Sequence, residues 1–445
     1  MLKIILPLYS YRYLYGMRYL QSESGKVNDS WSFKELDRSE TSYLTHSYHT
    51  YPAKFIPQLA ARLIKENSNI EDLICDPFMG SGTTLVEAIV RDRRAYGTDV
   101  NPVAVLITKA KTTPIEPEKL ERKVHSLQKA IRHHLIDENE QTLLLKKEDL
   151  AVVLPENERI DYWFPEKQKR DLSIILSGIM GIEDENIRNF LLCAFSHILK
   201  GCSRWMMKSV KPTIDKNKIV NNAYRSFFTH THKMLEKNRL FWKKVEGKKI
   251  DCIVDNVDAR KMTIPTNSAS LIVTSPPYVT SYEYADLHQL TAIWLGYMKM
   301  VSEFRSRFIG SIQKEHSRSE LYSDIAKTII DKLRLIDKRE ANGVEQYFFE
   351  MQQCFEEMHR VLKHGGRASI VIGDTDLKKV KIHNADVFLQ TMKKIGFEVH
   401  DIIKRPIPSK ILPLTRDEKT GRFVATTKAD RLAYPIESIL IMEKT

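Results

Sequence analysis

The chain of 445 residues is long enough for a sizeable core and for about two to four structural units. Its 69 Lys and Arg against 57 Asp and Glu leave a formal net charge of +12, which favours a polyanionic partner. Its five cysteines, none at C-x-x-C spacing, argue against a disulfide framework and a zinc ribbon, and no apolar run is long enough to cross a membrane. We therefore expect a cytoplasmic protein without a membrane partner.

The first half of the sequence begins as an α/β domain. Residues 1 to about 45 form a polar and aromatic lead-in, which we expect to be an arm or a short helical cap. DLICD at 72–76 indicates a buried strand, and the run TLVEAIVRDRR after it indicates a helix. A second strand, AYGTDV, ends near Asp99 and precedes a helix from Pro102 to about Lys111.

The alternation of strands and helices stops at about residue 113 and resumes at 251. Between these positions apolar residues recur at three- and four-residue steps, which predicts helices. The later strands are DCIVD, SLIVT, RASIVIGD, a stretch near 397–405 and ESILIME, with a helical stretch at about 283–363. This order predicts a doubly wound α/β fold, with a mostly parallel sheet covered by helices on both faces and interrupted by a helical insert.

A glycine loop, DPFMGSGTT, lies directly between the first strand and its helix. Gly80 and Gly82 allow backbone conformations that other residues avoid, and they let main-chain N–H groups approach a ligand. A Walker A loop requires a Lys directly after its second glycine, and no Lys follows Gly82. The glycine spacing is also shorter than in the dinucleotide-binding pattern G-x-G-x-x-G. A purely structural turn is the alternative for such a loop taken alone.

Two carboxylates at later strand ends extend this candidate nucleotide site. Asp99 follows the glycine loop by about 20 residues, where an acidic side chain can accept hydrogen bonds from both ribose hydroxyls. Asp258 ends the third strand segment and is placed to reach an adenine amino group. A nucleoside without a long phosphate chain fits these features best, although acidic residues at strand ends are commonly only solvated.

The glycine loop and the sequence Thr274-Ser275-Pro276-Pro277-Tyr278 together resemble amino-group DNA methyltransferases. Asp76 to Gly82 resembles their S-adenosylmethionine loop, Ser275 to Tyr278 their catalytic tetrapeptide, and HTYPAKF at 49–55 the segment that closes over the methionine end of the cofactor. The resemblance covers about 46–110 and 251–445 and implies a seven-stranded, Rossmann-like methyltransferase sheet.

The resemblance also implies a set of site residues and a cofactor, S-adenosylmethionine, with no metal. The cofactor residues are Pro52, Lys54, Asp76, Pro77, Phe78, Gly80, Ser81, Gly82, Thr83, Asp99, Asp258 and Ala259. The catalytic residues are Ser275, Pro276, Pro277 and Tyr278. The implied domains are an arm (1–45), a cofactor-binding half (46–112), a helical insert that is a candidate target-recognition region (113–250) and a catalytic half (251–445).

The tetrapeptide suits chemistry on an exocyclic amino group for a physical reason. The lone pair of such a nitrogen is delocalised into the base, so hydrogen-bond acceptors on its two N–H groups would make it a better nucleophile. The Ser275 hydroxyl and the Pro276 carbonyl can supply two acceptors held rigidly by fixed proline φ angles. Tyr278 offers a ring for stacking a base that is flipped out of double-stranded DNA.

Several activities remain open at this level. The family form Ser-Pro-Pro-Tyr favours cytosine N4, with adenine N6 as the alternative, whereas C5-cytosine chemistry would need a Pro-Cys pair that the chain lacks. An RNA or tRNA guanine-N2 methyltransferase and a non-catalytic nucleic-acid-binding protein are the other interpretations. We expect a prokaryotic, nucleoid-associated enzyme whose cognate restriction endonuclease acts in the same system without a stable complex; the sequence does not indicate an oligomeric state.

Three segments are candidates for reading the DNA. Ser203–Lys249 holds 13 Lys and Arg against three Asp and Glu. Its interleaved aromatic residues, which could stack on bases, are Trp205, Tyr224, Phe227, Phe228 and Trp242. The others are the basic stretch Arg305–Arg339 and the late segment 404–422. His230 and His232 have no nearby cysteine or carboxylate pattern, so we expect surface residues rather than metal ligands.

Overall fold

The computed structural model describes residues 27–51, 54–136, 155–209, 211–279, 284–311, 320–407, 415–416, 423–424, 431–432 and 436–445. None of the helices in these ranges is both long and apolar enough to span a lipid bilayer. Most of the predicted DNA-reading segment 404–422, and residues 1–26 of the predicted arm, lie outside the described residues.

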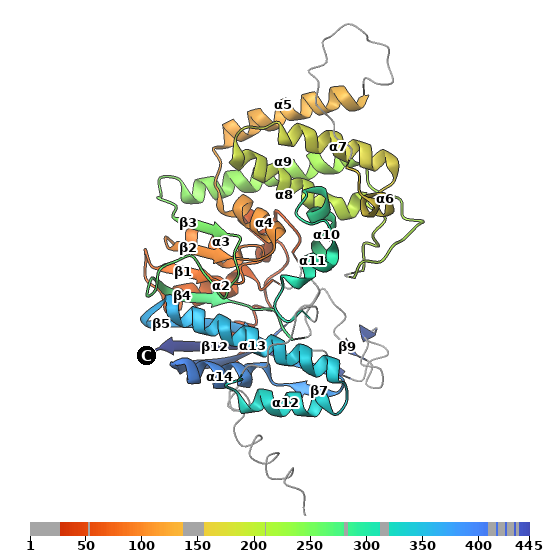
Figure 1. Cartoon of the computed structure of the whole chain (residues 1–445). Helices are drawn as coiled ribbons and strands as arrows, with labels where there is room; N and C mark the ends of the chain where they lie inside the picture. The colour runs from red at the N-terminus through yellow and green to blue at the C-terminus, as the bar shows by residue number, and fades with distance from the viewer. Residues whose placement is uncertain are drawn as a thin grey trace, which may run out of the picture.

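A seven-stranded sheet forms the centre of the molecule (Figure 1). Its strands follow the spatial order β3 (Cys252–Asp255), β2 (Arg94–Thr98), β1 (Leu73–Asp76), β4 (Ala269–Thr274), β5 (Leu362–Ile372), β12 (Ile436–Lys444) and β8 (Phe397–Pro406). The strands from β3 to β5 pair in parallel, whereas β12 runs antiparallel to both of its neighbours. The predicted mostly parallel, seven-stranded sheet is therefore confirmed.

Helices bury both faces of this sheet. One face is covered by α2 (Pro57–Asn67) and α3 (Thr83–Ile89), and the other by α12 (Asp324–Arg334), α13 (Lys338–Val361) and α14 (Asn384–Ile395). Successive strand side chains point to opposite sides, so Leu271 and Val273 of β4 pack toward α2 and α3 while Ile272 packs toward α13. Because both faces are buried, the inner parallel strands β1 and β4 lack the polar alternation of a half-exposed strand.

Some elements around the sheet were not predicted. These are α2, α14 and a small hairpin of β6 (Thr375–Leu377) and β7 (Val380–Ile382). The glycine after α14 is a sequence signal for the end of this helix. Gly396 has a φ of +116°, in the left-handed region that is typical after a helix C-terminus. Proline at the first position of α2 is a comparable signal at a helix start.

The described part of the N-terminal arm runs as short 3-10 helices along the edge of the molecule. These are η2 (Asp29–Trp31), η3 (Glu40–Ser42) and η4 (Leu44–Ser47). Trp31 is buried against the core around α2 and α3, and the Arg62 guanidinium lies 3.8 Å from the centre of its ring. The N–H of Asn28 donates to the carbonyl of Lys404 over 2.8 Å, which ties the arm to β8.

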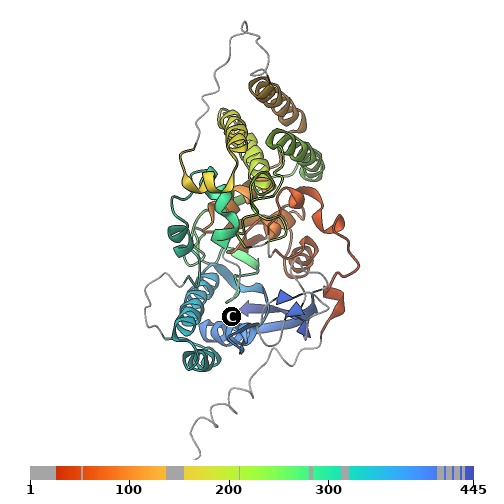
Figure 2. The ribbon, with the colours of Figure 1, turned by 90° about the vertical axis from the view of Figure 1, so that its right-hand side faces the viewer.

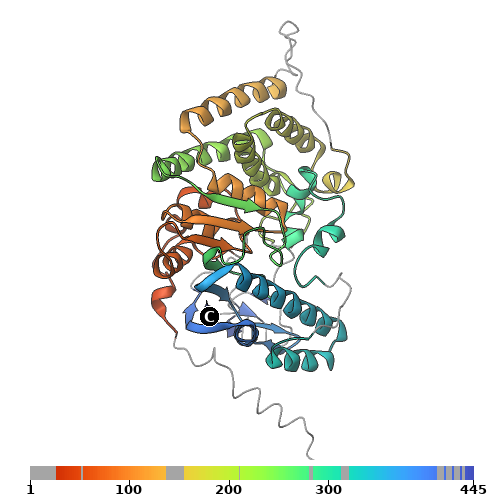
Figure 3. The same cartoon turned by 60° about the vertical axis from the view of Figure 1, so that its left-hand side comes forward.

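A helical layer lies beyond the β3 edge of the sheet (Figures 1 and 3). It contains α5 (Pro117–Ile136), α6 (Glu158–Trp163), α7 (Glu166–Met180), α8 (Glu185–Cys202) and α9 (Ala223–Val245). Its core is continuous with α4 (Pro102–Thr112), α10 (Tyr284–Trp294) and α11 (Val301–Ser306). The layer is therefore packed against helices that precede and follow it in the chain, so its position relative to the strands is determined by shared side-chain packing.

Two expectations about this layer are wrong. Trp205, Phe227 and Phe228 were expected to stack on bases, but they are only 2%, 0% and 3% exposed. They belong to the hydrophobic core, so they have no free ring face for a base. His230 is not a simple surface residue either, because its ring stacks on His197 with 3.7 Å between centroids; His232 is exposed, as expected.

We predict that Gly82→Ala destabilises the protein more than Gly247→Ala does. Both glycines have left-handed φ angles, +73° and +74°. A Cβ atom at position 82 would lie 2.7 Å from Thr108 Cγ2, whereas nothing lies within 4 Å of one at position 247. Urea denaturation should show a loss of about 1 kcal/mol for Gly247→Ala and roughly 2–4 kcal/mol for Gly82→Ala. Equal losses would contradict the close packing of the glycine loop on α4.

Candidate active site

The glycine loop and the tetrapeptide meet because β1 and β4 are neighbours. Strand order reverses between these two strands, and open α/β sheets bind ligands at such a reversal, outside the carboxyl ends of the strands. The Thr274 hydroxyl donates to Asp76 Oδ1 over 2.7 Å, and the Thr84 hydroxyl donates to the Val273 carbonyl over 3.0 Å. These two bonds join the last residues of β4 to the end of β1 and to the start of α3, on either side of the glycine loop.

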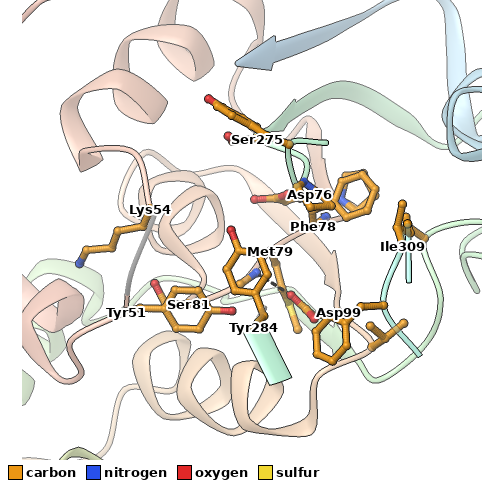
Figure 4. Close-up of a pocket in the computed structure, with 18 of the residues that line it drawn as sticks. Tyr51, Lys54, Asp76, Phe78, Met79, Ser81, Asp99, Ser275, Tyr284 and Ile309 are labelled. Carbon is orange, nitrogen blue, oxygen red and sulfur yellow. Dashed lines mark hydrogen bonds between the residues drawn. The ribbon is translucent and has the colours of Figure 1, made fainter. Parts of the chain in front are cut away.

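A pocket opens between the two loops (Figure 4). Of the predicted site residues, its wall contains Lys54, Asp76, Pro77, Phe78, Gly80, Ser81, Thr83, Asp99, Asp258, Ala259, Ser275, Pro277 and Tyr278. Gly82 and Pro276 do not line it, and Pro52 lies outside the described residues. Segments that are far apart in the sequence therefore converge on one cavity.

The two glycines of the loop have different positions. The Gly80 N–H donates to Asp99 Oδ2 over 3.0 Å, and a Cβ on this glycine would lie 3.2 Å from the Tyr51 ring. Gly80 is thus held in the pocket wall between an aromatic ring and a carboxylate. Gly82 instead begins α3 and packs on Thr108, so its absent side chain serves close helix packing rather than direct contact with a ligand.

Two carboxyl groups of the pocket have raised pKa values. Burial raises the pKa of Asp76 to about 6, against the opposing effect of the hydrogen bond from Thr274. Burial also raises the pKa of Asp99 to about 6, although the backbone N–H groups of Asn101 and Gly80 lower it. Both groups are therefore largely ionised at neutral pH, and the cavity presents negative charge to a ligand.

A chain of charged groups builds the opposite end of the pocket. Both Asp258 carboxylate oxygens accept hydrogen bonds from Arg260, at 2.9 and 2.6 Å. Arg260 also contacts Glu350 of α13 over 3.3 Å, and this buried glutamate accepts the N–H of Gly310 over 2.6 Å. The network orients Asp258 and attaches the segment around Ile309, another wall residue, to α13.

The tetrapeptide is supported from two other segments. The Tyr347 hydroxyl of α13 donates to the Pro277 carbonyl over 2.7 Å. A Cβ on Gly373 would lie 3.2 Å from the Tyr278 ring, so this ring packs directly over a backbone without a side chain. In the described part of the chain no hydrogen bond reaches the Pro276 carbonyl. Among the described residues, therefore, the carbonyl of the second proline helps to fix the loop, while that of the first accepts no hydrogen bond.

Several wall residues were not predicted. They are Tyr51, Phe55, Met79, Val100, Val279, Tyr284, Arg305, Phe308, Ile309, Gly310, Ser311 and Tyr347. Tyr51 lies within the resembling segment HTYPAKF, so that segment was a signal for it. Its ring centroid lies 6.4 Å from that of Tyr284, with an interplanar angle of 25°. Both tyrosines are labelled in Figure 4. The residues after Tyr284 have no local motif, because only folding brings them here.

Lys54 supplies a positive charge to the wall. Its amino group donates to the His46 carbonyl over 3.1 Å, and burial lowers its pKa to about 8. The group therefore still carries its charge at neutral pH. Within the described ranges, no group of three or more His, Cys, Asp or Glu side chains is arranged to hold a metal ion.

Comparison with known proteins shows to which family the chain belongs. A family model described as "DNA methylase", for N6 and N4 methyltransferases, matches residues 9–110 and 269–445. These two stretches make up more than half of the chain and contain both loops of the pocket. The protein belongs to the DNA methylase family. Its methyl donor is S-adenosylmethionine, which confirms the predicted cofactor, and its substrate is DNA.

The chain is also similar to individual proteins, among them two type II methyltransferases and one solved structure. The methylase is 28% identical to the type II methyltransferase M.MvaI of Kocuria varians over 424 residues, which cover 88% of this chain and 90% of the relative. It is 37% identical to the type II methyltransferase M.MjaII of Methanocaldococcus jannaschii over 97 residues, or 22% of this chain and 18% of that one. A putative DNA modification methylase from Thermus thermophilus, solved with S-adenosylmethionine, aligns at 20% identity over 42% of this chain and 53% of its own, with a TM-score of 0.20.

The pocket of this methylase fits such a cofactor. S-adenosylmethionine is a nucleoside that carries a positive sulfonium, and the wall contains the carboxylates of Asp76, Asp99 and Asp258. Gly80 adds no side chain to the wall, and Lys54 offers a charge complementary to the carboxylate of a methionine.

We predict that cofactor affinity falls as the pH drops through about 6. The folded pKa of Asp99 is raised to about 6, so its carboxyl group is ionised above this pH and becomes protonated below it. Protonation removes a negative charge and acceptor capacity, so affinity should fall about tenfold from pH 7 to pH 5. Isothermal titration with S-adenosylmethionine measures this.

The Asp99→Asn variant should bind more weakly at pH 7 and show a flatter pH profile. Asp255→Asn is the matched control, because Asp255 ends the adjacent strand and does not line the pocket. An unchanged pH profile in Asp99→Asn would mean that this carboxylate does not hold the cofactor.

Proposed function

We propose that the protein is a type II DNA methyltransferase that transfers a methyl group to an exocyclic amino group, and that this group is N4 of cytosine. The observation that carries the proposal is that Ser275, Pro277 and Tyr278 of the tetrapeptide line the pocket and that the preceding residue, Thr274, is hydrogen-bonded to Asp76 of the glycine loop. The names of the relatives M.MvaI and M.MjaII, both type II methyltransferases, support the class. We also propose that it is the modification partner of a restriction system.

The cofactor roles follow from positions on the wall. Asp99 accepts hydrogen bonds from ribose hydroxyls, and Asp258, oriented by Arg260, accepts one from the adenine amino group. Each carboxylate oxygen has more than one acceptor site, so the bonds to Arg260 do not prevent this contact. Lys54 pairs with the methionine carboxylate, and Phe78 and Ile309 line the adenine end next to Asp258.

The catalytic role of the tetrapeptide is to activate a nitrogen. When bound, S-adenosylmethionine supplies an electrophilic methyl group on its sulfonium. The Ser275 hydroxyl and the Pro276 carbonyl accept hydrogen bonds from the two N–H groups of the target base, which draws its nitrogen lone pair away from the ring. The nitrogen bonds to the methyl carbon as the carbon–sulfur bond breaks, and the nitrogen then loses one proton to solvent.

The second proline and the tyrosine position this clamp. The bond from Tyr347 to the Pro277 carbonyl fixes the loop so that the preceding carbonyl keeps its direction. Tyr278 provides the ring on which a flipped base stacks, and burial raises the pKa of its hydroxyl well above the usual range. The hydroxyl therefore stays protonated, and the ring neutral, at neutral pH. A flipped base implies double-stranded DNA as the substrate.

We predict that Ser275→Ala reduces the single-turnover methylation rate by about 100-fold or more, because one of the two acceptors is lost. Affinity for S-adenosylmethionine should stay within about threefold of the wild type, since the cofactor contacts lie on other residues. Ser268→Ala is the control, because Ser268 precedes the opposite end of β4 and its hydroxyl donates only to the Pro265 carbonyl. An unchanged rate in Ser275→Ala would refute the proposed clamp.

We predict N4-methylcytosine, in one fixed sequence context, in the DNA of a host that expresses the protein. Modified-base sequencing identifies both the base and its context, and a host that carries the Ser275→Ala variant is the control. Finding N6-methyladenine instead would overturn the cytosine assignment while leaving the fold and the cofactor unaffected. Methyl transfer to RNA and not to duplex DNA would overturn the proposed substrate.

A further inference from the structure

A short hairpin projects from the helical layer between α8 and α9. It comprises residues 203–209 and 211–219, which we call the 203–219 hairpin. Trp205 and Ile214 form an antiparallel bridge, the N–H of Met206 donates to the Thr213 carbonyl over 2.9 Å, and the N–H of Asp215 donates to the Arg204 carbonyl over 2.8 Å. The hairpin thus has regular backbone pairing and a defined direction.

Two side chains anchor the base of the hairpin. The buried Trp205 ring stacks on Trp163 of α6, with 5.3 Å between centroids and an interplanar angle of 24°. The Lys218 amino group donates to the carbonyls of Trp205 and Lys200, over 2.7 and 2.8 Å. The buried Trp205 ring and the two bonds from Lys218 hold the base of the hairpin in place, and thereby its outer part.

The outer part of the hairpin displays side chains that its own fold does not use. Met206, Met207 and Ile219 are 38%, 56% and 93% exposed. Lys208, Lys211 and Lys216 are exposed beside them. In the whole segment from 203 to 219 Asp215 is the single acidic residue against five Lys and Arg. Exposed apolar side chains among positive charges are typical of a surface that meets an anionic partner with an apolar component.

The hairpin lies on the same side of the molecule as the pocket. In Figure 1 it is the yellow-green loop on the right, toward which the parallel strands point, and in Figure 2 it faces the viewer. Packing also connects the two. Phe164, directly after α6, meets Trp294 of α10 edge to face at 5.4 Å, and Arg159 of α6 donates to Gln289 of α10 over 2.8 Å. The first residue of α10, Tyr284, lines the pocket.

The rest of the basic segment is placed differently. Helix α9 runs back from the hairpin toward the start of β3, so Lys243 and Lys244, which are exposed, lie at the end of the layer remote from the strand carboxyl ends (Figure 1). The hairpin, and not these two lysines, therefore lies on the side of the molecule that holds the pocket.

We propose that the 203–219 hairpin binds the duplex next to the target base, with Lys208 and Lys211 on phosphates and Met206 and Met207 against base edges or sugars in a groove. Phosphate contacts by lysine provide affinity that depends on salt, whereas apolar contacts with bases contribute to sequence choice. This inference rests on the proposed function, in which double-stranded DNA is the substrate.

The test compares two double variants of the full chain. Lys208→Ala with Lys211→Ala removes two charges from the hairpin, and Lys243→Ala with Lys244→Ala removes two from the same basic segment at the far end of α9. Each is titrated with a duplex of about 30 base pairs, a length of about three turns, that carries the methylated context found by sequencing. Affinity is measured between about 50 and 200 mM salt, where phosphate contacts have their largest effect.

The hairpin variant should bind the duplex about tenfold more weakly at low salt, with a slope of log affinity against log salt reduced by about 2. The α9 variant should match the wild type, and both should bind S-adenosylmethionine normally, which shows that they are folded. Met206→Ala with Met207→Ala should keep the salt slope but lower the ratio of affinities for the methylated context and a scrambled duplex.

Three outcomes would overturn the inference. Equal effects of the two lysine pairs would mean that the hairpin makes no particular contact. A hairpin variant that binds DNA like the wild type but loses self-association in sedimentation would assign the surface to a second copy of the chain. If the wild type binds and methylates the duplex while the hairpin variant does so equally well, only the hairpin assignment fails; if the wild type does not methylate duplex DNA, the proposed function fails first.

Discussion

The hydrogen bond from Thr274 to Asp76 is the contact on which the site depends. It joins the ends of two adjacent parallel strands at the point where the strand order reverses, so the loops that follow must leave the sheet side by side. Asp76 is almost completely buried, and an unpaired carboxylate in such a place would be costly. The threonine hydroxyl offsets this cost, and the same bond fixes the distance between the glycine loop and Ser275.

Helix α13, on the face of the sheet opposite α2 and α3, supports other parts of the pocket. Helix α13 supplies Tyr347 to the Pro277 carbonyl and Glu350 to Arg260 and Gly310, so one rigid helix supports both the tetrapeptide and the proposed adenine end. The helical layer contributes through α10, whose core is shared with α6 and α8. The pocket, the tetrapeptide and the proposed DNA-contacting hairpin are thus connected through packed helices.

Much of the fold could be predicted because the signals were local. The central strands β1 and β4 were recognised from short apolar runs, since burial on both faces removes the polar alternation that would otherwise mark them. Most predicted site residues also reach the pocket, because they directly follow strands. Gly82 and Pro276 were predicted to be site residues but do not line the pocket. Thr108 occupies the space beside Gly82. Next to Pro276, the Pro277 carbonyl accepts a hydrogen bond from Tyr347. Trp205 and Phe227 were misjudged because a basic, aromatic segment has the same composition whether its rings face solvent or the core.

The sequence by itself determined the sheet, the two loops, the family resemblance and the cofactor, because each depends on residues that are close together in the chain. Only the tertiary structure decided which side chains complete the pocket, that Asp258 is oriented by Arg260 and Glu350, and that the hairpin rather than α9 lies on the catalytic side. These facts depend on contacts between residues that are far apart in the chain, which no local pattern of apolar, charged or glycine residues encodes.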